Sequence, residues 1–376
     1  MSTPQARTFR RAVTIKDVAR LSGVSPATVT RVMRGRGSVR EETRHRVEEA
    51  VRILGYRPNH IARALVTRSS STVGLLLPSS GDSFWGEVAA GIEERASEAG
   101  FSVLFANAHG SETREHDMIE LFLSKGVDGI IIAGAAGGPQ TWFGSRDPRV
   151  PIVLVNWDAT FRAQDLEAAA VLPAGDMTAA IARETSGSDG IIHIVFDDPG
   201  GVAMLVEHLL QLGHTRIAFV GGTAIRPALL RILGFRQALE GAGLRHSAIV
   251  GCEESLDGGN DAALSILSGP DPPTAIVAYS DLVAIGVMRG ARTLERRVPE
   301  DVSVVGFNDI EVAAFLEPPL TTVRQPMREM GWQAMARILD SLAGRPTPPY
   351  EAMPGTLMVR RSTGSAAAVS PSTQGR

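Results

Sequence analysis

The sequence has very little cysteine: a single residue, Cys252, in a chain of 376. No disulfide can form within such a chain, which excludes the small secreted domains that disulfides hold together. A reducing compartment is favoured, and we expect a cytoplasmic protein. Aromatic residues are also few, at 5%, whereas glycine is abundant, with 39 residues. That balance is typical of α/β proteins, in which many tight turns connect strands to helices.

Long hydrophobic runs are missing as well. No apolar segment approaches the roughly 20 residues that a membrane-spanning helix needs, so we expect no association with a membrane. The first 12 residues contain Arg7, Arg10 and Arg11, but the apolar stretch of a secretory signal does not follow them. We expect residues 1–12 to be disordered.

The chain also lacks the usual residue sets of enzymes. It has no HExxH motif, no recognisable Ser/His/Asp set and no paired cysteines. Residues 134–138 are rich in glycine, but the Lys-Ser/Thr of a phosphate-binding loop is missing there. We therefore expect no enzyme, no cofactor and no metal ion.

Charge is unevenly distributed. The first 68 residues hold 15 Lys and Arg against 5 Asp and Glu; by difference from the totals of 38 and 41, the rest of the chain holds 23 and 36. A basic head on an acidic body indicates that the head alone meets a polyanion. The alternative, a solvated basic tail, conflicts with the ordered helical pattern of the head.

Residues 13–55 predict three short helices. Thr14, followed three residues later by Asp17, has the form of a capping box. Gly23 suits a tight turn, Ser25 can cap a second helix, and residues 41–54 form the third. Apolar residues recur at helical spacing, and the expected inward faces carry Ile15, Val18 and Ala19, then Val29, Val32 and Met33, and then Val47, Val51 and Leu54.

Two helices joined by a short turn that contains glycine predict a helix-turn-helix, whose second helix enters the DNA major groove. Arg31 could pair with guanine, and Thr30 could reach a base or a phosphate. A three-helix bundle with a basic surface is the alternative. The expected DNA-contacting residues of the head are Thr14, Ser25, Pro26, Ala27, Thr28, Thr30 and Arg31.

From residue 73 onward, apolar strands alternate with helical patterns such as 85–99 and 113–124. Near-continuous apolar strands of this kind predict parallel sheets covered on both faces, and about eight strands indicate two subdomains. The tail, residues 363–376, is expected to be disordered. The expected strands are 73–77, 102–106, 129–133, 152–156, 191–196, 216–220, 275–278 and 302–307.

The head resembles that of the LacI/GalR (lactose-repressor-like) family of transcriptional regulators. The likeness runs from Val13 to Val32 and continues through residues 54–59 and 62–65. It implies a helix-turn-helix domain at 13–58 and a hinge helix with its linker at 59–71. In the family a hinge leucine wedges into the minor groove and kinks the duplex. Leu65 has that position, flanked by Asn59 and Ala62; the alternative is an ordinary linker leucine packed on the core.

The same resemblance implies an effector-binding core at 72–362 that is similar to periplasmic binding proteins, with two doubly wound parallel-sheet subdomains. We assign 72–196 with 310–335 to one subdomain and 197–309 with 336–362 to the other. A ligand would bind beyond the carboxyl ends of the strands. The residues expected there are Phe84, Trp85, Asn156, Trp157, Arg231 and Asp281.

Several of these assignments have an alternative. An aromatic pair such as Phe84 and Trp85 at a helix start is often part of a core, and Arg231 and Asp281 could form a structural ion pair or a helix cap. Two departures from the family pattern also bear on the effector. About thirty residues separate Trp157 from the next strand, and the loop 222–230 lacks a clean match for polar ligand contacts.

Other positions are weaker candidates. Glu253 and Glu254 follow a strand but suit a solvated loop better, and Asn308-Asp309 lies at a strand end that the family places near its cleft. His193 falls inside an apolar strand, so a hydrogen-bonded core histidine is expected there.

Taken with the family resemblance, these features predict a sequence-specific DNA-binding repressor. A homodimer is expected to bind double-stranded operator DNA, and a small polar effector, with a carbohydrate favoured, is expected to control its affinity. A periplasmic solute-binding protein would need a signal peptide and would lack this head. An enzyme with an added helix-turn-helix, such as a sugar kinase, would need the missing catalytic residues.

Overall fold

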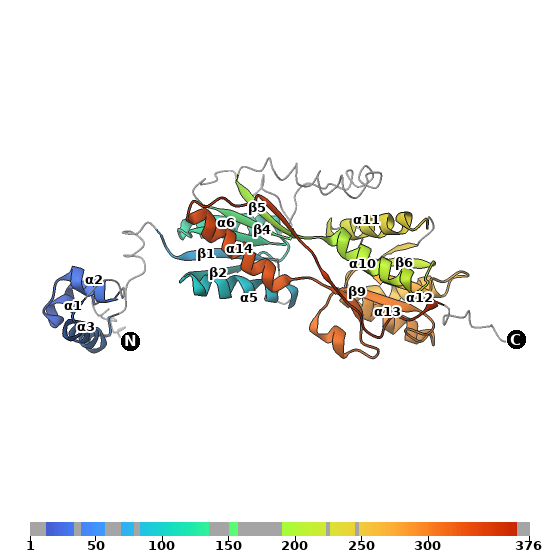
Figure 1. Ribbon diagram of the computed structural model, residues 1–376, viewed down its shortest axis with the longest axis horizontal. Helices are drawn as coiled ribbons and strands as arrows, with labels where there is room; N and C mark the ends of the chain where they lie inside the picture. Colours follow the sequence, from blue (N-terminus) through green and yellow to red (C-terminus); the bar gives the residue numbers. More distant parts are fainter. Residues whose placement is uncertain are drawn as a thin grey trace, which may run out of the picture. The chain divides into compact units, whose positions relative to one another are not determined.

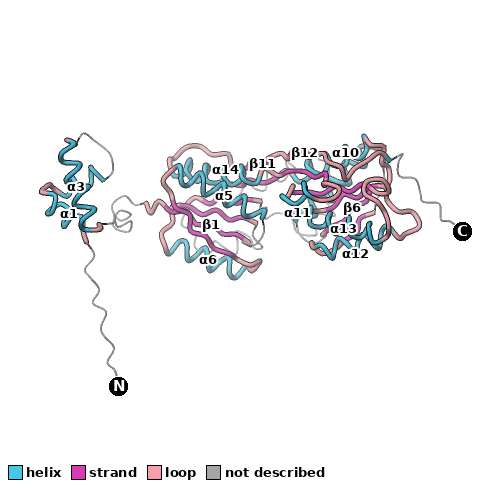
Figure 2. The backbone as a smooth tube through the Cα atoms, turned by 90° about the horizontal axis from the view of Figure 1, so that it is seen from below, coloured by secondary structure: helices cyan, strands magenta, loops and turns pink. Residues whose placement is uncertain are grey.

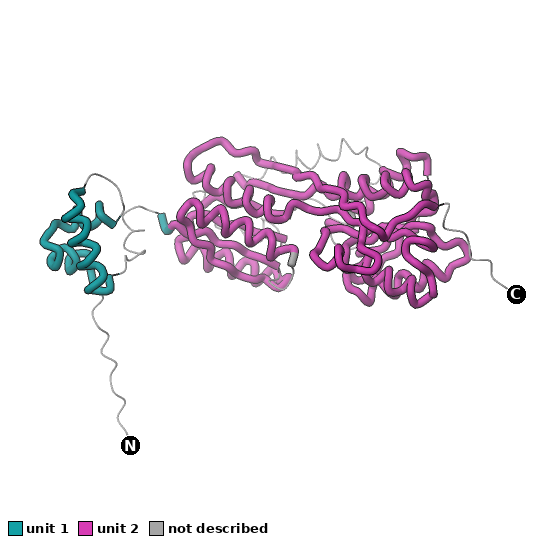
Figure 3. The backbone as a smooth tube through the Cα atoms, turned by 60° about the horizontal axis from the view of Figure 1, so that its bottom comes forward, with its two compact units in different colours: residues 1–70 teal, residues 71–376 magenta. Residues whose placement is uncertain are grey.

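The computed structural model describes residues 13–33, 39–56, 69–78, 83–134, 150–156, 190–222, 226–244 and 248–366. The predictions for residues 1–12, for the hinge residues Asn59, Ala62 and Leu65, and for Trp157 lie outside the described residues. The chain divides into two compact units, residues 1–70 and residues 71–376, coloured separately in Figure 3. The division lies within one residue of the predicted boundary between linker and core.

The described residues of the first unit form three helices around a small apolar core. The helices are α1 (Ile15–Ser22), α2 (Pro26–Met33) and α3 (Glu41–Leu54), as the sequence predicts. Met33 is exposed, so its predicted place on the inward face is wrong: α2 ends there and its buried stripe stops at Val32. The buried side chains are Val18, Ala19, Val29, Val32, Val47 and Ala50.

Local hydrogen bonds set the helix ends in this unit. The Asp17 carboxylate accepts bonds from the Thr14 backbone N–H, at 2.9 Å, and the Thr14 hydroxyl, at 2.6 Å. Gly23 ends α1 at a φ of 68°, a conformation that glycine adopts without steric cost. Ser25 caps α2, because its Oγ accepts the Thr28 N–H at 3.1 Å.

The second unit contains two six-stranded sheets, each with helices packed on it (Figures 1 and 2). We call the first sheet and its helices the first lobe. Its strand order is β11-β5-β4-β3-β1-β2, and all of its described pairings are parallel. Its strands are β1 (Thr72–Leu77), β2 (Ser102–Asn107), β3 (Gly129–Ala133), β4 (Ile152–Val155), β5 (Ile191–Phe196) and β11 (Tyr350–Met353), and its helices are α5 (Ser83–Glu98), α6 (Glu112–Ser124) and α14 (Met327–Leu342).

The second sheet and its helices form the second lobe. Its strand order is β12-β10-β9-β8-β6-β7, and only the β10–β12 pairing is antiparallel among those described. Its strands are β6 (Ile217–Gly221), β7 (Ile249–Gly251), β8 (Ala275–Ala278), β9 (Ser303–Asn308), β10 (Thr321–Arg324) and β12 (Thr356–Met358), and its helices are α10 (Asp198–Gln211), α11 (Arg226–Gly241), α12 (Leu256–Leu267), α13 (Asp281–Thr293) and the 3₁₀ helix η1 (Glu311–Phe315). No described helix is long and apolar enough to cross a membrane.

Within the described part of the chain, three segments pass between the lobes: from β5 to α10, from β10 to α14, and from β11 to β12. The predicted subdomain boundaries are therefore wrong after residue 309. Residues 310–324 stay in the second lobe, because β10 pairs with β9, and residues 336–353 belong to the first lobe, because α14 packs there and β11 pairs with β5. These strands are short and partly polar, so their pairing is set by distant neighbours rather than by local pattern.

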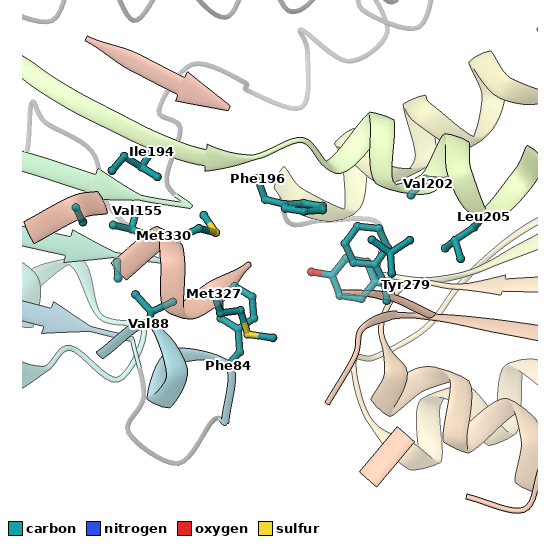
Figure 4. Close-up of a cluster of buried hydrophobic side chains, with 14 of the residues drawn as sticks. Phe84, Val88, Val155, Ile194, Phe196, Val202, Leu205, Tyr279, Met327 and Met330 are labelled. Carbon is teal, nitrogen blue, oxygen red and sulfur yellow. The ribbon is translucent and has the colours of Figure 1, made fainter. Parts of the chain in front are cut away.

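Buried apolar side chains of both lobes meet near these passages. Phe196, at the end of β5, packs edge-on against Phe307 of β9, with ring centroids 5.5 Å apart. Figure 4 shows Phe84 and Met327 at the edge of the first lobe, with Phe196 near the passage and Tyr279 on the second lobe. The lobes thus share part of one apolar core beside the polar residues described below.

The prediction of a disordered tail from residue 363 is wrong for its first residues, because they are held in the second lobe. Gly364 accepts a bond from the ring of the buried His214, at 3.0 Å, and donates to the Ser303 hydroxyl, also at 3.0 Å. The N–H of Ala366 donates to the carbonyl of Leu212. Residues 367–376 lie outside the described part of the chain.

We expect truncation before Thr363 to destabilise the second lobe, whereas truncation before residue 367 has little effect. The longer truncation removes the partners of His214 and Ser303, and each buried polar group left unpaired costs about 1–3 kcal/mol. Urea unfolding of both truncated chains checks this. Equal stability of the two chains would contradict the role given to residues 363–366.

Candidate functional site

The helix α2 presents a mixed polar and apolar surface opposite its buried stripe. Pro26, Ala27 and Arg31 are exposed, while Val29 and Val32 face the core. The predicted division of this helix into a core face and a free face is thus present, apart from Met33. The free face carries the side chains that the sequence analysis assigned to base contacts.

The hydroxyl groups around α2 are already engaged in local bonds. The hydroxyls of Ser25 and Thr28 lie 2.9 Å apart, and Thr30 donates to the carbonyl of Pro26 at 2.9 Å. Only one of the two protons is used between Ser25 and Thr28, so the other hydroxyl can still donate to a phosphate. Ser25 therefore combines a capping role with a place at the proposed DNA surface.

Arg31 differs from several other arginines of the head. Within the described residues it has no ion-pair partner, and its side chain is exposed. A guanidinium without a local carboxylate can pair with a base or a phosphate without first breaking an ion pair. Three other arginines of the head pair with acids on their own helices: Arg20 with Asp17 at 3.7 Å, Arg44 with Glu41 at 3.5 Å, and Arg52 with Glu49 at 2.5 Å.

At the carboxyl end of the first sheet, Phe84 and Trp85 lie in different surroundings. Phe84 is buried in the core, while the half-buried Trp85 packs edge-on against it, with ring centroids 4.7 Å apart. A Cβ on Gly134, which follows β3, would collide with the Trp85 ring. The Trp85 ring therefore lies against the backbone at the end of β3. Phe84 lies in the core, which is the alternative that the sequence analysis gave for this aromatic pair.

Asn156 connects the ends of two strands. It follows β4 with a φ of 47°, and its Oδ1 accepts the Phe196 N–H at 2.9 Å. Asparagine tolerates this left-handed conformation better than most residues. The amide oxygen is thus occupied at the first passage between the lobes, and the Nδ2 group is the part that a ligand would meet.

Arg231 lies in the interior of the second lobe at the carboxyl end of its sheet. Its Nε donates to Asp198 at 2.7 Å, and its Nη1 donates to the carbonyl of Tyr279 at 2.6 Å. The guanidinium carbon lies 4.5 Å from the centroid of the Tyr279 ring and 3.9 Å from that of Phe307. Two bonds and two aromatic faces therefore fix the group in one orientation.

The ion pair between Arg231 and Asp198 is buried on both sides. Burial raises the pKa of the Asp198 carboxyl, and the charge of Arg231 opposes that rise. Burial on its own would lower the pKa of the Arg231 guanidinium, but Asp198, Tyr279 and Glu254 together raise it. Each charge is tolerated in the interior because the other is present. The sequence analysis named Arg231 but missed Asp198, although two aspartates directly follow the strand at 191–196.

For Asp281 the structure favours a structural role, and the predicted ligand contact stays a prediction. The side chain is fully buried, its Oδ1 accepts the Thr322 hydroxyl at 2.6 Å, and its Oδ2 accepts the Ile310 N–H at 2.8 Å. A Cβ on Gly306 would collide with this carboxylate, so glycine there makes room for it. Asp281 joins α13, β10 and the segment before η1. Burial raises its pKa to about 6.

Two amide side chains lie nearby at the ends of β9 and β10. Gln325 Nε2 donates to Asn308 Oδ1 at 2.8 Å, and among the described residues the buried Gln325 Oε1 has no partner. Asn308 has a φ of 112°, a sparsely populated conformation that is enriched at functional sites. The sequence analysis ranked Asn308 low and missed Gln325. The strand directly before Gln325 begins with two threonines and was not recognised. Among the described residues no group of His, Cys, Asp and Glu could hold a metal ion.

Comparison with known proteins identifies the family. Residues 14–59 match the model for bacterial regulatory proteins of the lacI family, and residues 206–363 match a periplasmic binding protein-like domain. The chain is 34% identical over 340 residues to the ribose operon repressor of Escherichia coli strain K12, which covers 89% of this chain and 94% of that protein. The chain belongs to the lacI family of bacterial regulatory proteins. The predicted family is confirmed.

Further relatives and solved structures agree. The transcriptional repressor CytR of the same strain is 32% identical over 344 residues, covering 91% of this chain and 93% of CytR. The lac repressor dimer bound to operator and the anti-inducer ONPF has a TM-score of 0.78 at 26% identity, over 94% of this chain and 100% of that one. The regulator CelR in complex with cellobiose has a TM-score of 0.64 at 28% identity, over 93% of this chain and 99% of CelR.

Family membership confirms the fold class, a helix-turn-helix head with an effector core of two parallel-sheet subdomains. This lacI-family chain is a DNA-binding transcriptional regulator with a periplasmic-binding-protein-like effector domain. Members of the family are regulators rather than enzymes, so the prediction of a non-enzymatic protein is confirmed.

We expect Asp281→Asn to remove one part of the pH dependence of stability. The pKa of Asp281 is about 6 in the folded protein, whereas that of an unfolded aspartate is 3.8. Between these two pH values the carboxyl is therefore mostly protonated in the folded state and mostly ionised in the unfolded state. The wild type therefore loses stability as pH rises from 4 to 6, by an amount on the order of 3 kcal/mol. Denaturant unfolding between pH 4 and pH 7 measures it. If the difference between variant and wild type stays constant over that range, the buried carboxyl does not titrate as described.

Proposed function

We propose that this protein represses transcription by binding an operator as a homodimer, and that a small polar effector, a carbohydrate, changes its operator affinity. The observation that carries this proposal is the pairing of two features in one chain. The head has a free helix face with an unpaired arginine, and the core gathers amide, guanidinium and indole groups at the carboxyl ends of its strands.

In the head, α2 is the recognition helix. Arg31 pairs with a guanine, Pro26 and Ala27 make apolar contacts, and the hydroxyls of Ser25 and Thr28 reach phosphates together with Thr14. The hinge part of the proposal rests on the sequence alone. There, Leu65 inserts into the minor groove, flanked by Asn59 and Ala62.

In the core, the effector binds between the lobes, against Trp85 and Asn156 of the first lobe and Arg231, Asn308 and Gln325 of the second. Amide and guanidinium groups supply hydrogen bonds to hydroxyls, and an indole face suits the apolar face of a sugar ring. The names of relatives support this class: a ribose operon repressor, and CelR bound to cellobiose. Trp157 remains a candidate from the sequence.

A dimer is supported by apolar side chains that a monomer would leave in water. Leu104 and Phe105 are exposed on β2, the strand at the edge of the first sheet. Phe315 on η1 is 80% exposed, and Val312, three residues earlier in η1, is exposed too. Exposed apolar side chains of this size are typical of protein interfaces. The lac repressor, which this chain resembles, was solved as a dimer on its operator.

Regulation follows from the position of the effector beside the passages between the lobes. A ligand that binds one arrangement of the lobes more tightly shifts the population toward it, and the paired hinges respond. Because this is a coupling free energy, operator and effector alter each other's affinity by the same factor.

We expect Arg31→Ala to weaken operator binding by about 10- to 100-fold, since a bidentate arginine–guanine pair gives about 1–3 kcal/mol of discrimination. Binding to random DNA should weaken much less. Fluorescence anisotropy on an operator selected from genomic fragments measures both. Arg20→Ala is the matched control, because Arg20 is exposed but paired with Asp17. If the affinity for operator and the affinity for random DNA fall equally, Arg31 does not take part in base recognition.

We expect Gln325→Ala to weaken effector binding at least tenfold, because the buried amide would donate to or accept from ligand hydroxyls. Thermal shift against a panel of sugars and nucleosides identifies the effector, and titration calorimetry then compares the variants. Gln333→Ala on α14, a partly exposed glutamine paired with Glu329, is the control. An unchanged affinity in Gln325→Ala would place the effector elsewhere.

A further inference from the structure

We propose that the effector site selects uncharged ligands and rejects their anionic derivatives, such as sugar phosphates, because the charge of Arg231 is already balanced by Asp198. This inference rests on the proposed function, since it specifies the charge of the carbohydrate that binds at this edge. Asp198 becomes the residue that determines this specificity.

The geometry makes Arg231 a hydrogen-bond donor rather than an open positive charge. Its Nε faces Asp198 at 2.7 Å, its Nη1 is bound to the Tyr279 carbonyl, and two aromatic rings cover it. No described residue binds the Nη2 group, which is left to meet a ligand oxygen. With its charge matched inside the protein, it can donate to a hydroxyl at little electrostatic cost.

A phosphate or carboxylate in the same place meets different forces. It would be attracted by Arg231 and repelled by Asp198 in surroundings of low polarity, where both interactions are stronger than in water. The anion would also lose its hydration without gaining an unmatched cation. Glu254 adds to the negative field, because its charge also acts on Arg231.

The other guanidinium groups near β9 are paired as well. Arg324 Nε lies 2.7 Å from Asp309 Oδ2, and Arg360 Nη2 lies 2.5 Å from Asp309 Oδ1. Arg360 also donates to the carbonyl of Leu320. These described cations are therefore already bound to a carboxylate of the second lobe, which fits a site built for a neutral ligand.

The test compares neutral sugars with their own phosphates on the full-length protein. Titration calorimetry with D-ribose and D-ribose 5-phosphate, and with D-glucose and D-glucose 6-phosphate, gives the ratio of affinities for each pair. Asp198→Asn leaves Arg231 as an unmatched cation, and Asp198→Asn with Arg231→Gln leaves a neutral pair. Asp257→Asn removes an exposed carboxylate that pairs with Arg289 on the helix surface, and controls for net charge.

In the wild type we expect the neutral form of the sugar that binds to be preferred at least 100-fold. Asp198→Asn should reduce this preference at least tenfold, whereas the double variant and Asp257→Asn should keep it. If Asp198→Asn does not fold, Arg231→Gln replaces it. That variant removes the cation and leaves Asp198 buried, so no positive charge attracts an anion and the preference should be kept; a preference reduced tenfold or more overturns the inference.

A wild type that binds a sugar phosphate as tightly as the sugar overturns the inference while the carbohydrate proposal stands. An unchanged ratio in Asp198→Asn overturns it as well. If no sugar binds any variant, the carbohydrate proposal fails, and inorganic phosphate then decides the inference alone. Phosphate should raise the Tm of Asp198→Asn but not that of the wild type. Equal Tm shifts in the two proteins would contradict the proposal that Asp198 balances the charge of Arg231.

Discussion

The three passages of the chain between the lobes are the constraint on which the site depends. All three leave the carboxyl ends of strands, β5, β10 and β11, which is where ligands bind in open α/β sheets. Asp198 and Gln325 come within two residues of such strand ends. The segments that carry candidate ligand contacts are therefore the segments that connect the lobes. A ligand held there acts directly on backbone that must change when the lobes move.

The ion pair of Arg231 and Asp198 has a cost that its position explains. Taking two charges out of water is expensive, and a buried pair often contributes no more stability than apolar residues of the same size. Stability therefore gives little reason to keep it. What the pair supplies is a donor group with a fixed direction and a matched charge, next to the ends of β8 and β9. That is useful for recognising hydroxyl groups and of little use for packing.

Much of the fold could be predicted because its signals are local. The strands at 129–133, 191–196 and 275–278 have the predicted bounds, since each is a near-continuous apolar run between turn residues. The helices of the head follow from their capping residues and apolar spacing. The late strands were missed because their pairing is non-local. The buried Thr321 and Thr322 open β10, and a run so short and polar does not read as a strand.

The site was only partly predictable for a related reason. The order of strands and helices predicts that Arg231 and Asp281 lie at the carboxyl edge of a sheet. Which of them faces a ligand depends on the direction of a side chain and on its neighbours in space. Asp281 turns inward because Gly306 leaves room and Thr322 donates to it, and neither contact is visible in sequence spacing.

The third passage has a consequence for synthesis of the protein. The first sheet includes residues 350–353, and the second includes residues 356–358 and is held by residues up to 366. Neither lobe can complete its sheet until almost the whole chain has emerged from the ribosome. The helical head, which holds its own core near the amino terminus, can fold long before that. A nascent chain therefore presents a finished DNA-binding surface while its sensing domain is still incomplete.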